Sequence, residues 1–170
     1  SPNHFSVLGV APAQGRAFLP EEETPGKPSQ VAIVSHNYWR KHGGDRSVLG
    51  SQITINGRPF TVVGVMPRGF SGTMQLFSPE VWLPLSVYDQ VANDFAGEGH
   101  ESLSDRTGKQ LLLLGRLKPG VSGKAAEPAL KTLATNLEAA FPVEQKDQTL
   151  MTTPLSRFST SNAPMDDGGV

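Results

Sequence analysis

Apolar positions in the first half of the chain fall into short runs of the β type. The run Val31-Ala32-Ile33-Val34 is mostly β-branched and lies between Pro28 and Ser35, which predicts a fully buried strand. Ser35 is placed to cap a short helix over residues 37–42, and Gly43-Gly44 ends it because glycine adopts the left-handed geometry of a helix end at low cost. Similar patterns predict a short helix that ends at Gly9, a turn capped by Asp45, and further strands at 81–85, 110–117 and 148–153.

A hairpin is predicted from Gln52 to Val65. Its turn is Asn56-Gly57, since both residues tolerate the positive φ angles of a two-residue type I′ turn. The turn sets the register, in which Ile55 faces Arg58, Thr54 faces Pro59 and Ile53 faces Phe60. Alternation then places Ile53, Ile55, Phe60 and Val62 on one face, and Thr54, Thr61, Val63 and Val65 on the other. Because Pro59 has no N–H to donate, this end of the hairpin is expected at a sheet edge.

One long helix is predicted from Lys124 to Phe141, with Pro128 in its early turns. Its apolar stripe consists of Ala126, Leu130, Leu133, Leu137 and Phe141. A single stripe indicates one buried face, which we expect to pack on a sheet. The order of elements predicts an α+β domain with a mixed β-sheet and helices mainly on one face.

Composition narrows the class of protein without naming an activity. The chain has 170 residues, enough for one domain, and 18 Gly with 14 Pro make it rich in turns. It has no cysteine, which excludes disulfides, thiolate metal sites and cysteine nucleophiles. Since 15 Lys+Arg nearly balance 16 Asp+Glu, no overall field favours nucleic acid or an anionic membrane. No run approaches the roughly 20 apolar residues of a membrane-spanning helix.

Motifs that would signal catalysis are absent from the sequence. Gly115 to Gly120 is not followed by Lys and Ser/Thr, so there is no phosphate-binding loop. His100-Glu101 begins like a zinc-protease helix, but Ser104 stands where the second histidine is needed. Ser71 and Ser122 both lie outside the Gly-x-Ser-x-Gly pattern of hydrolases. We therefore assign no catalytic, cofactor-binding or metal-binding residue.

Three groups of residues each allow a functional and a structural interpretation. A zinc site would need all four histidines, His4, His36, His42 and His100, and surface histidines are expected instead. The turn Glu21-Glu22-Glu23 would bind a cation only with further carboxylates nearby, so a solvated acidic turn is expected. Tyr38 and Trp39 have the chemistry to stack on a sugar or base, but core packing is expected beside a buried strand.

Several stretches together resemble the periplasmic core domain of MacB-type ABC-transporter permeases, and most of all the permeases in which this domain is duplicated. The longest is VLGSQITINGRPFTVVGVMP at 48–67. The others, in chain order, are FSVLGVAPAQGR at 5–16, VAIVSHNYW at 31–39, GGD at 43–45, VWLPL at 81–85 and GRLKPGVS at 115–122. Their ordered succession covers residues 5–141.

The resemblance implies a domain inserted between the first two transmembrane helices of an inner-membrane permease. It implies a porter-like part plus an intergrown lobe that contains the hairpin. Residues 1–157 are expected to form the core domain, truncated on its N-terminal side, and residues 158–170 a disordered tail. It also implies that ATP is hydrolysed by a separate cytoplasmic domain, so this chain is expected to hold no cofactor.

We expect a non-catalytic domain that couples membrane-helix motion to a periplasmic substrate or partner, of the efflux or lipoprotein-handling type. The implied partners are the transmembrane and ATP-binding parts of the same transporter, with a periplasmic adaptor, a lipoprotein and a homodimer through the parent permease as further candidates. The expected contact surface is the Asn56-Gly57 turn together with a mobile stretch at 92–109. The alternatives are a stand-alone periplasmic ligand-binding module, with a closed apolar pocket, and a metal-dependent hydrolase that uses the histidines.

Overall fold

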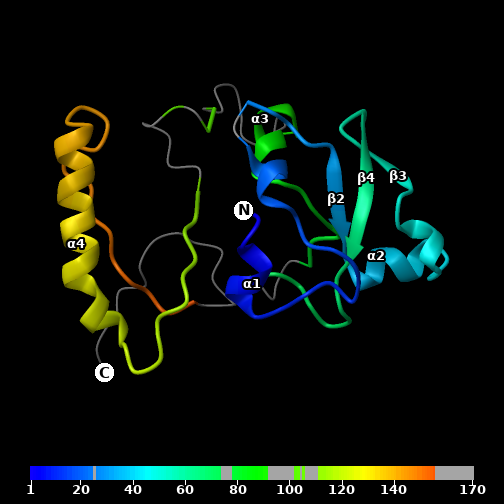
Figure 1. Ribbon diagram of the computed structural model, residues 1–170, viewed down its shortest axis with the longest axis horizontal. Helices are drawn as coiled ribbons and strands as arrows, with labels where there is room; N and C mark the ends of the chain where they lie inside the picture. Colours follow the sequence, from blue (N-terminus) through cyan, green and yellow to red (C-terminus); the bar gives the residue numbers. More distant parts are fainter. Residues whose placement is uncertain (25, 74–77, 92–101, 104, 106–110, 156–170) are drawn as a thin grey trace.

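The computed structural model describes residues 1–24, 26–73, 78–91, 102–103, 105 and 111–155. Within these ranges five strands form one mixed sheet (Figure 1). β2 (Val31–Val34) lies parallel to β4 (Arg58–Val65), and β5 (Val81–Trp82) pairs antiparallel with the other side of β2. β1 (Gln14–Gly15) and β3 (Gln52–Ile55) both pair antiparallel with β4. The predicted α+β class with a mixed sheet is therefore confirmed.

Short helices cover the sheet, and most of them lie on one face. That face carries α2 (His36–Lys41), the 3₁₀ turns η2 (Arg46–Val48) and η3 (Leu85–Val87), and α3 (Tyr88–Val91). The other face is covered by α1 (His4–Leu8). The strand predicted at 81–85 is confirmed only over β5, because Pro84 precedes η3.

The three clusters of buried apolar residues all lie in the sheet half of the chain, and Ala134, which is 9% exposed, is a buried residue outside them. One cluster, on the α1 face, contains Phe5, Phe18, Ile33 and Met66. Two clusters on the opposite face contain Val34, Val48, Val62 and Val65, and Ala32, Phe60 and Val87. Since every member of the three clusters lies between Phe5 and Val87, the stability of this body comes from the first 91 residues.

The hairpin forms with the predicted turn and register. Asn56 has φ of 47° and Gly57 has φ of 75°, and β3 pairs with β4 so that Ile55 faces Arg58 and the other predicted pairs follow. Pairing of β4 with β2 begins only at Thr61. Pro59 therefore lies beyond the end of β2, at the sheet edge where its missing N–H does no harm.

One side chain of the hairpin lies on the opposite face of the sheet from the one predicted. Ala32 of β2 faces Val62, but the next residue, Ile33, faces Gly64. The extra residue in β4 is a β-bulge, which reverses the alternation beyond it. Val65 consequently joins Val62 in the same core cluster, whereas strict alternation predicts opposite faces.

The turn chemistry between β2 and η2 is as predicted. The Oγ of Ser35 accepts a hydrogen bond from the N–H of Tyr38 at 3.0 Å and so caps α2. Gly43 and Gly44, with φ of 100° and 69°, end the helix. Asp45 caps η2 through its carboxylate.

Two predicted strands do not form. Residues 111–118 contain no strand, Gln110 lies outside the described residues, and Leu111, Leu112 and Leu113 are 51%, 60% and 77% exposed. Residues 148–153 also contain no strand. An apolar β-type run becomes a strand only where a neighbour accepts its backbone hydrogen bonds. The pairings of the described sheet include neither segment.

The long helix forms, but it does not pack on the sheet. α4 (Gly123–Ala140) contains Pro128 and ends at Phe141, close to the predicted bounds. In Figure 1 it stands apart from the sheet, at the left of the view. Leu133 of its apolar stripe is 47% exposed, and no described residue of α4 belongs to a core cluster. The predicted packing of this stripe on a sheet is therefore wrong for the described residues.

Some predictions concern residues that the structure does not describe. The surface stretch at 92–109 lies outside the described residues except for Ser102, Leu103 and Asp105, and the tail at 158–170 lies wholly outside them. Among the helices that the structure describes, none has the length and apolar character needed to cross a bilayer.

Candidate functional site

The tip of the hairpin is exposed and held in place by the end of α3. Asn56 and Gly57 both face solvent. The side-chain Nδ2 of Asn56 donates a hydrogen bond to the carbonyl oxygen of Val91 at 2.9 Å. This contact joins residues 35 positions apart in the sequence, so the tip is fixed by more than its own turn.

The other described part of the expected contact surface returns to the same helix. The carboxylate of Asp89, in α3, accepts hydrogen bonds from Ser102 Oγ at 2.8 Å and from the N–H of Leu103 at 3.3 Å. Val91, the residue bonded to the hairpin tip, lies in that helix too. The structure thus brings the hairpin tip and residues 102–103, which the sequence analysis grouped as one surface, to a common support.

The acidic turn is not solvated as a whole, which corrects the sequence-based expectation. Within the 3₁₀ turn η1 (Pro20–Glu23), Glu21 is exposed but Glu22 is only 7% exposed. Arg16 donates two hydrogen bonds to the Glu22 carboxylate, at 2.9 and 2.7 Å, and the N–H of Leu19 donates a third at 2.8 Å. Glu22 turns inward because these donors replace the water that a carboxylate loses on burial.

Electrostatics favour the ionised form of Glu22. Burial raises the pKa of its carboxyl group, but the hydrogen bonds from Arg16 and from the N–H of Leu19, with the positive charge of Arg16, outweigh burial and lower the pKa below its usual range. The same hydrogen bond raises the pKa of Arg16. The pair is therefore a charged, bidentate clamp between the end of β1 and η1.

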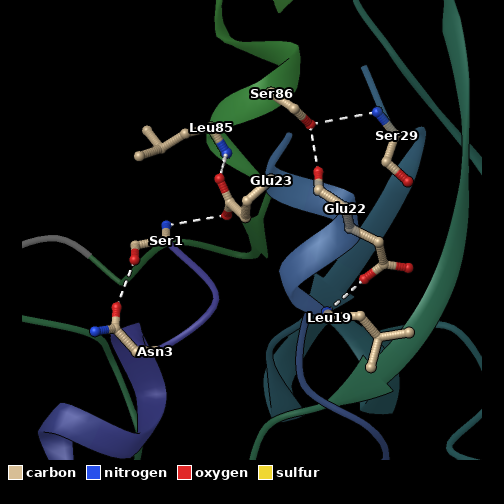
Figure 2. Close-up of polar contacts among 8 residues, drawn as sticks. All are labelled: Ser1, Asn3, Leu19, Glu22, Glu23, Ser29, Leu85 and Ser86. Carbon is tan, nitrogen blue, oxygen red and sulfur yellow. Dashed lines mark hydrogen bonds and ion pairs between the residues drawn. The ribbon is translucent and has the colours of Figure 1, made fainter. Parts of the chain in front are cut away.

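Glu23 and Ser86 extend this clamp into a polar hub (Figure 2). The Glu23 carboxylate accepts a hydrogen bond from the N–H of Leu85 at 2.8 Å and lies 3.0 Å from the amino group of Ser1. Ser86 Oγ donates to the carbonyl oxygen of Glu22 at 2.6 Å and accepts from the N–H of Ser29 at 3.3 Å. The hub therefore ties η1 to η3 and to the entry of β2.

A groove of about 510 Å³ lies beside α2. Its lining is mostly polar, and Lys41 forms an ion pair with Glu80 across one part of it. The lining residues are Ser35, His36, Asn37, Arg40, Lys41, Gly69, Phe70, Ser71, Ser78, Pro79 and Glu80. The ligand-binding alternative predicts a closed pocket with an apolar lining, whereas the lining of this groove is mostly polar.

The three histidines that the structure describes, His4, His36 and His42, each contact a neighbouring aromatic ring. The ring of His42 stacks on Tyr38 with 4.0 Å between ring centroids, and His36 meets Trp39 edge to face. Burial and the positive amino terminus lower the pKa of His4. Among the described residues no three His, Asp or Glu side chains are grouped as metal ligands would be, and His100 lies outside those residues.

The remaining singled-out side chains have structural roles. Tyr38 and Trp39 pack against the cluster that contains Val62, which confirms the core interpretation. The indole N–H of Trp39 donates to the carbonyl oxygen of Asp45 at 2.7 Å. Ser122 caps α4 by accepting from the N–H of Ala125.

Two of the contacts that the sequence did not predict are made by arginines. One is the Arg16–Glu22 clamp, for which the only signal is an arginine six residues before an acidic turn. The other is a hydrogen bond at 2.9 Å from Arg116 Nε to the carbonyl oxygen of Val7, which spans 109 positions. No local pattern points to the second contact, because one of its partners is a backbone atom.

The sequence is similar to known export proteins. It is 31% identical over 134 residues to the macrolide export ATP-binding/permease protein MacB of Chromobacterium violaceum, a match that covers 77% of this chain and 18% of that protein. Against the protein of the same name from Neisseria gonorrhoeae it is 31% identical over 102 residues, covering 57% of this chain and 14% of that protein. The chain thus spans less than a fifth of the length of these relatives.

Solved structures share the fold, and the family profile shows the membership. The periplasmic region of MacB from Actinobacillus actinomycetemcomitans aligns with a TM-score of 0.54 at 20% identity, covering 82% of this chain and 55% of that one. A domain of a putative permease from Porphyromonas gingivalis aligns with a TM-score of 0.51 at 20% identity, covering 95% and 66%. The profile of the MacB-like periplasmic core domain matches residues 1–133. The chain belongs to the MacB-like periplasmic core domain family.

Proposed function

We propose that this chain is the non-catalytic periplasmic domain of an ABC-transporter permease and relays the motion of transmembrane helices to a periplasmic substrate or partner. The observation that carries the proposal is the family match over residues 1–133. On this proposal ATP is hydrolysed by another part of the transporter, and this chain holds no cofactor. On this proposal the parent transporter is of the efflux or lipoprotein-handling type. Saturable turnover of a small molecule by the purified chain would contradict the proposal.

Support for a relay comes from the way distant segments are joined. A domain that transmits displacement has to move as one body, and long-range hydrogen bonds resist internal shear. The bonds from Leu85 to Glu23 and from Ser86 to Glu22 span 62 and 64 positions. Both bonds join η1, which follows β1, to η3, which follows β5. They therefore hold together two segments of the sheet unit that are distant in the sequence.

The proposed contact surface is the hairpin tip with the segment supported by α3. Its hairpin tip is exposed, residues 102–103 are partly buried, and the surface is fixed through Asn56 and Asp89. Its partners would be a periplasmic adaptor or a lipoprotein, while the transmembrane and ATP-binding parts of the transporter act from the other side. We further propose that residues 1–157 form the domain and that residues 158–170 are a tail. In the parent permease the domain would take part in a homodimer.

Charge reversal in the whole transporter tests the contact surface. Arg58 is exposed next to the turn at the hairpin tip, and Arg46 is another exposed arginine, in η2. Arg58→Glu is expected to lower export of the transporter's substrate several-fold, with expression and ATP hydrolysis retained, because rim charges steer partner association. Arg46→Glu is the matched control and is expected to leave export unchanged. Equal export by the two variants would remove the hairpin tip from the proposal.

A ligand-binding module is the second candidate, and the groove beside α2 is the cavity it would use, although the polar lining of the groove differs from the apolar lining that this candidate predicts. A small molecule that binds there stabilises the folded chain, by about 2.7 kcal/mol at one hundred times its dissociation constant. A screen of periplasmic solutes by thermal unfolding separates the two functions. A relay domain is expected to show no ligand-dependent rise in melting temperature, and a saturable rise that Arg40→Ala abolishes would favour the binding module.

A further inference from the structure

Arg116 caps the end of α1 from a distant part of the chain. Its Nε donates a hydrogen bond to the carbonyl oxygen of Val7 at 2.9 Å. α1 ends at Gly9, which has φ of 73° and the left-handed conformation of a helix end. A Cβ placed at Gly9 would lie 3.3 Å from Nη2 of Arg116. Glycine thus provides the helix end with both its geometry and the room for the guanidinium.

Inward from this contact, α1 is anchored in the core. Phe5 of α1 is 2% exposed. Its ring lies 6.0 Å from Phe70 and 6.1 Å from Trp82, measured between centroids. Phe5 also shares a cluster with Ile33 of β2, a strand with neighbours on both sides. A displacement of α1 is therefore felt directly at the middle of the sheet.

Outward from this contact, a short connection leads to α4. Beyond Arg116 the chain makes a turn, closed by the hydrogen bond from the N–H of Val121 to the carbonyl oxygen of Lys118 at 3.0 Å. Ser122 then caps α4. In Figure 1 this connection runs between α4 and α1. Since no described residue of α4 belongs to a core cluster, apolar packing between helix and sheet is replaced here by a polar contact.

We propose that Arg116 is the tether that fixes the helical unit (residues 111–155) against the sheet unit (residues 1–91). Through it, a displacement of α4 reaches α1, then Phe5, and then β2. This inference rests on the relay function proposed above and names the residue at which the relay enters the sheet. The planar guanidinium suits the site, because it donates from Nε while Nη2 lies close to Gly9.

A distance measurement in the whole chain tests the tether. The chain has no cysteine, so two introduced cysteines carry spin labels without background. Asn37→Cys in α2 and Lys131→Cys in α4 replace exposed residues, and pulsed electron paramagnetic resonance then gives the distribution of distances between the labels. We expect a narrow distribution, about twice as wide after Arg116→Ala, because the helical unit then moves independently. Arg116→Lys is expected to be intermediate, and Lys118→Ala, in the same connection, is the control that leaves the width unchanged.

Each outcome decides the proposal. An unchanged distribution in Arg116→Ala, or a distribution already broad in the labelled parent, would overturn the tether. Thermal unfolding of each variant shows that the sheet unit remains folded, since Arg116 contributes nothing to the three core clusters. Export by the full transporter separates the two proposals. If Arg116→Ala broadens the distance distribution but leaves export undiminished, the tether stands and the result counts against the relay.

Discussion

Three adjacent glutamates show how differently the fold treats identical side chains. Glu21 is exposed, whereas Glu22 is buried and bonded to Arg16 and to the N–H of Leu19. Which carboxylate turns inward depends on the path of the chain from β1 into η1. A sequence shows the charges but not that path, so the expectation of a solvated turn is confirmed for Glu21 and wrong for Glu22 and for Glu23, whose side chain is 8% exposed.

Neutralising Glu22 is expected to destabilise the protein in a pH-dependent way. Glu22→Gln removes a charged, bidentate partner of Arg16 and should lower the free energy of unfolding by about 1–3 kcal/mol at neutral pH. Because folding lowers the pKa of Glu22 from its ordinary value of 4.5, the folded state holds fewer protons than the unfolded state at acidic pH. The stabilisation is therefore complete above that value and disappears as the pH falls through the lowered folded pKa.

Urea unfolding at a series of pH values measures this difference. Glu21→Gln is the matched control, since Glu21 is the exposed neighbour in the same turn, and it is expected to change stability by less than about 0.5 kcal/mol. The gap between the parent and Glu22→Gln should close in acid. A gap that stayed constant from neutral pH to well below 4.5 would show that the charge of Glu22 is not what stabilises the clamp.

Elements whose signals are local could be predicted from the sequence. The hairpin register follows from Asn56-Gly57, and the bounds of α2 follow from Ser35 and from Gly43-Gly44. The β-bulge in β4 could not be predicted in this way. It lies where β4 meets both β1 and β2, and there the backbone of Gly64 approaches the backbone of Arg16 closely.

That close approach makes Gly64 a sensitive position. A Cβ at Gly64 would lie 2.4 Å from the carbonyl oxygen of Arg16, an atom of the backbone that cannot move aside without breaking the pairing of β1 with β4. Gly64→Ala is therefore expected to lower the free energy of unfolding by about 1–3 kcal/mol. Gly115→Ala is the control, because a Cβ there would meet nothing within 4 Å. Equal urea midpoints for the two variants would contradict the close approach.

At the scale of the whole molecule, the predictions that failed all needed a partner in space. The run at 110–117 has a β-type pattern and the stripe of α4 has a helical one, but each pattern says only that a face is apolar, not what covers it. The candidate site likewise has one part that could be predicted from the sequence and one that could not. Its hairpin tip could be predicted from Asn56-Gly57, whereas its support by Asp89 and Val91 depends on packing between distant elements.

Two truncations measure how much a buried and an exposed apolar side chain each contribute to the free energy of unfolding. Phe60 is fully buried in a core cluster, and Phe60→Ala is expected to lower the free energy of unfolding by about 3–5 kcal/mol, through lost burial and the cavity left behind. Leu113 is 77% exposed, so Leu113→Ala is expected to change it by less than about 0.5 kcal/mol. A strand buried at 110–117 would instead make Leu113→Ala cost about 2–5 kcal/mol. Urea unfolding of both variants therefore decides between an apolar pattern that is buried in this chain and one that faces solvent.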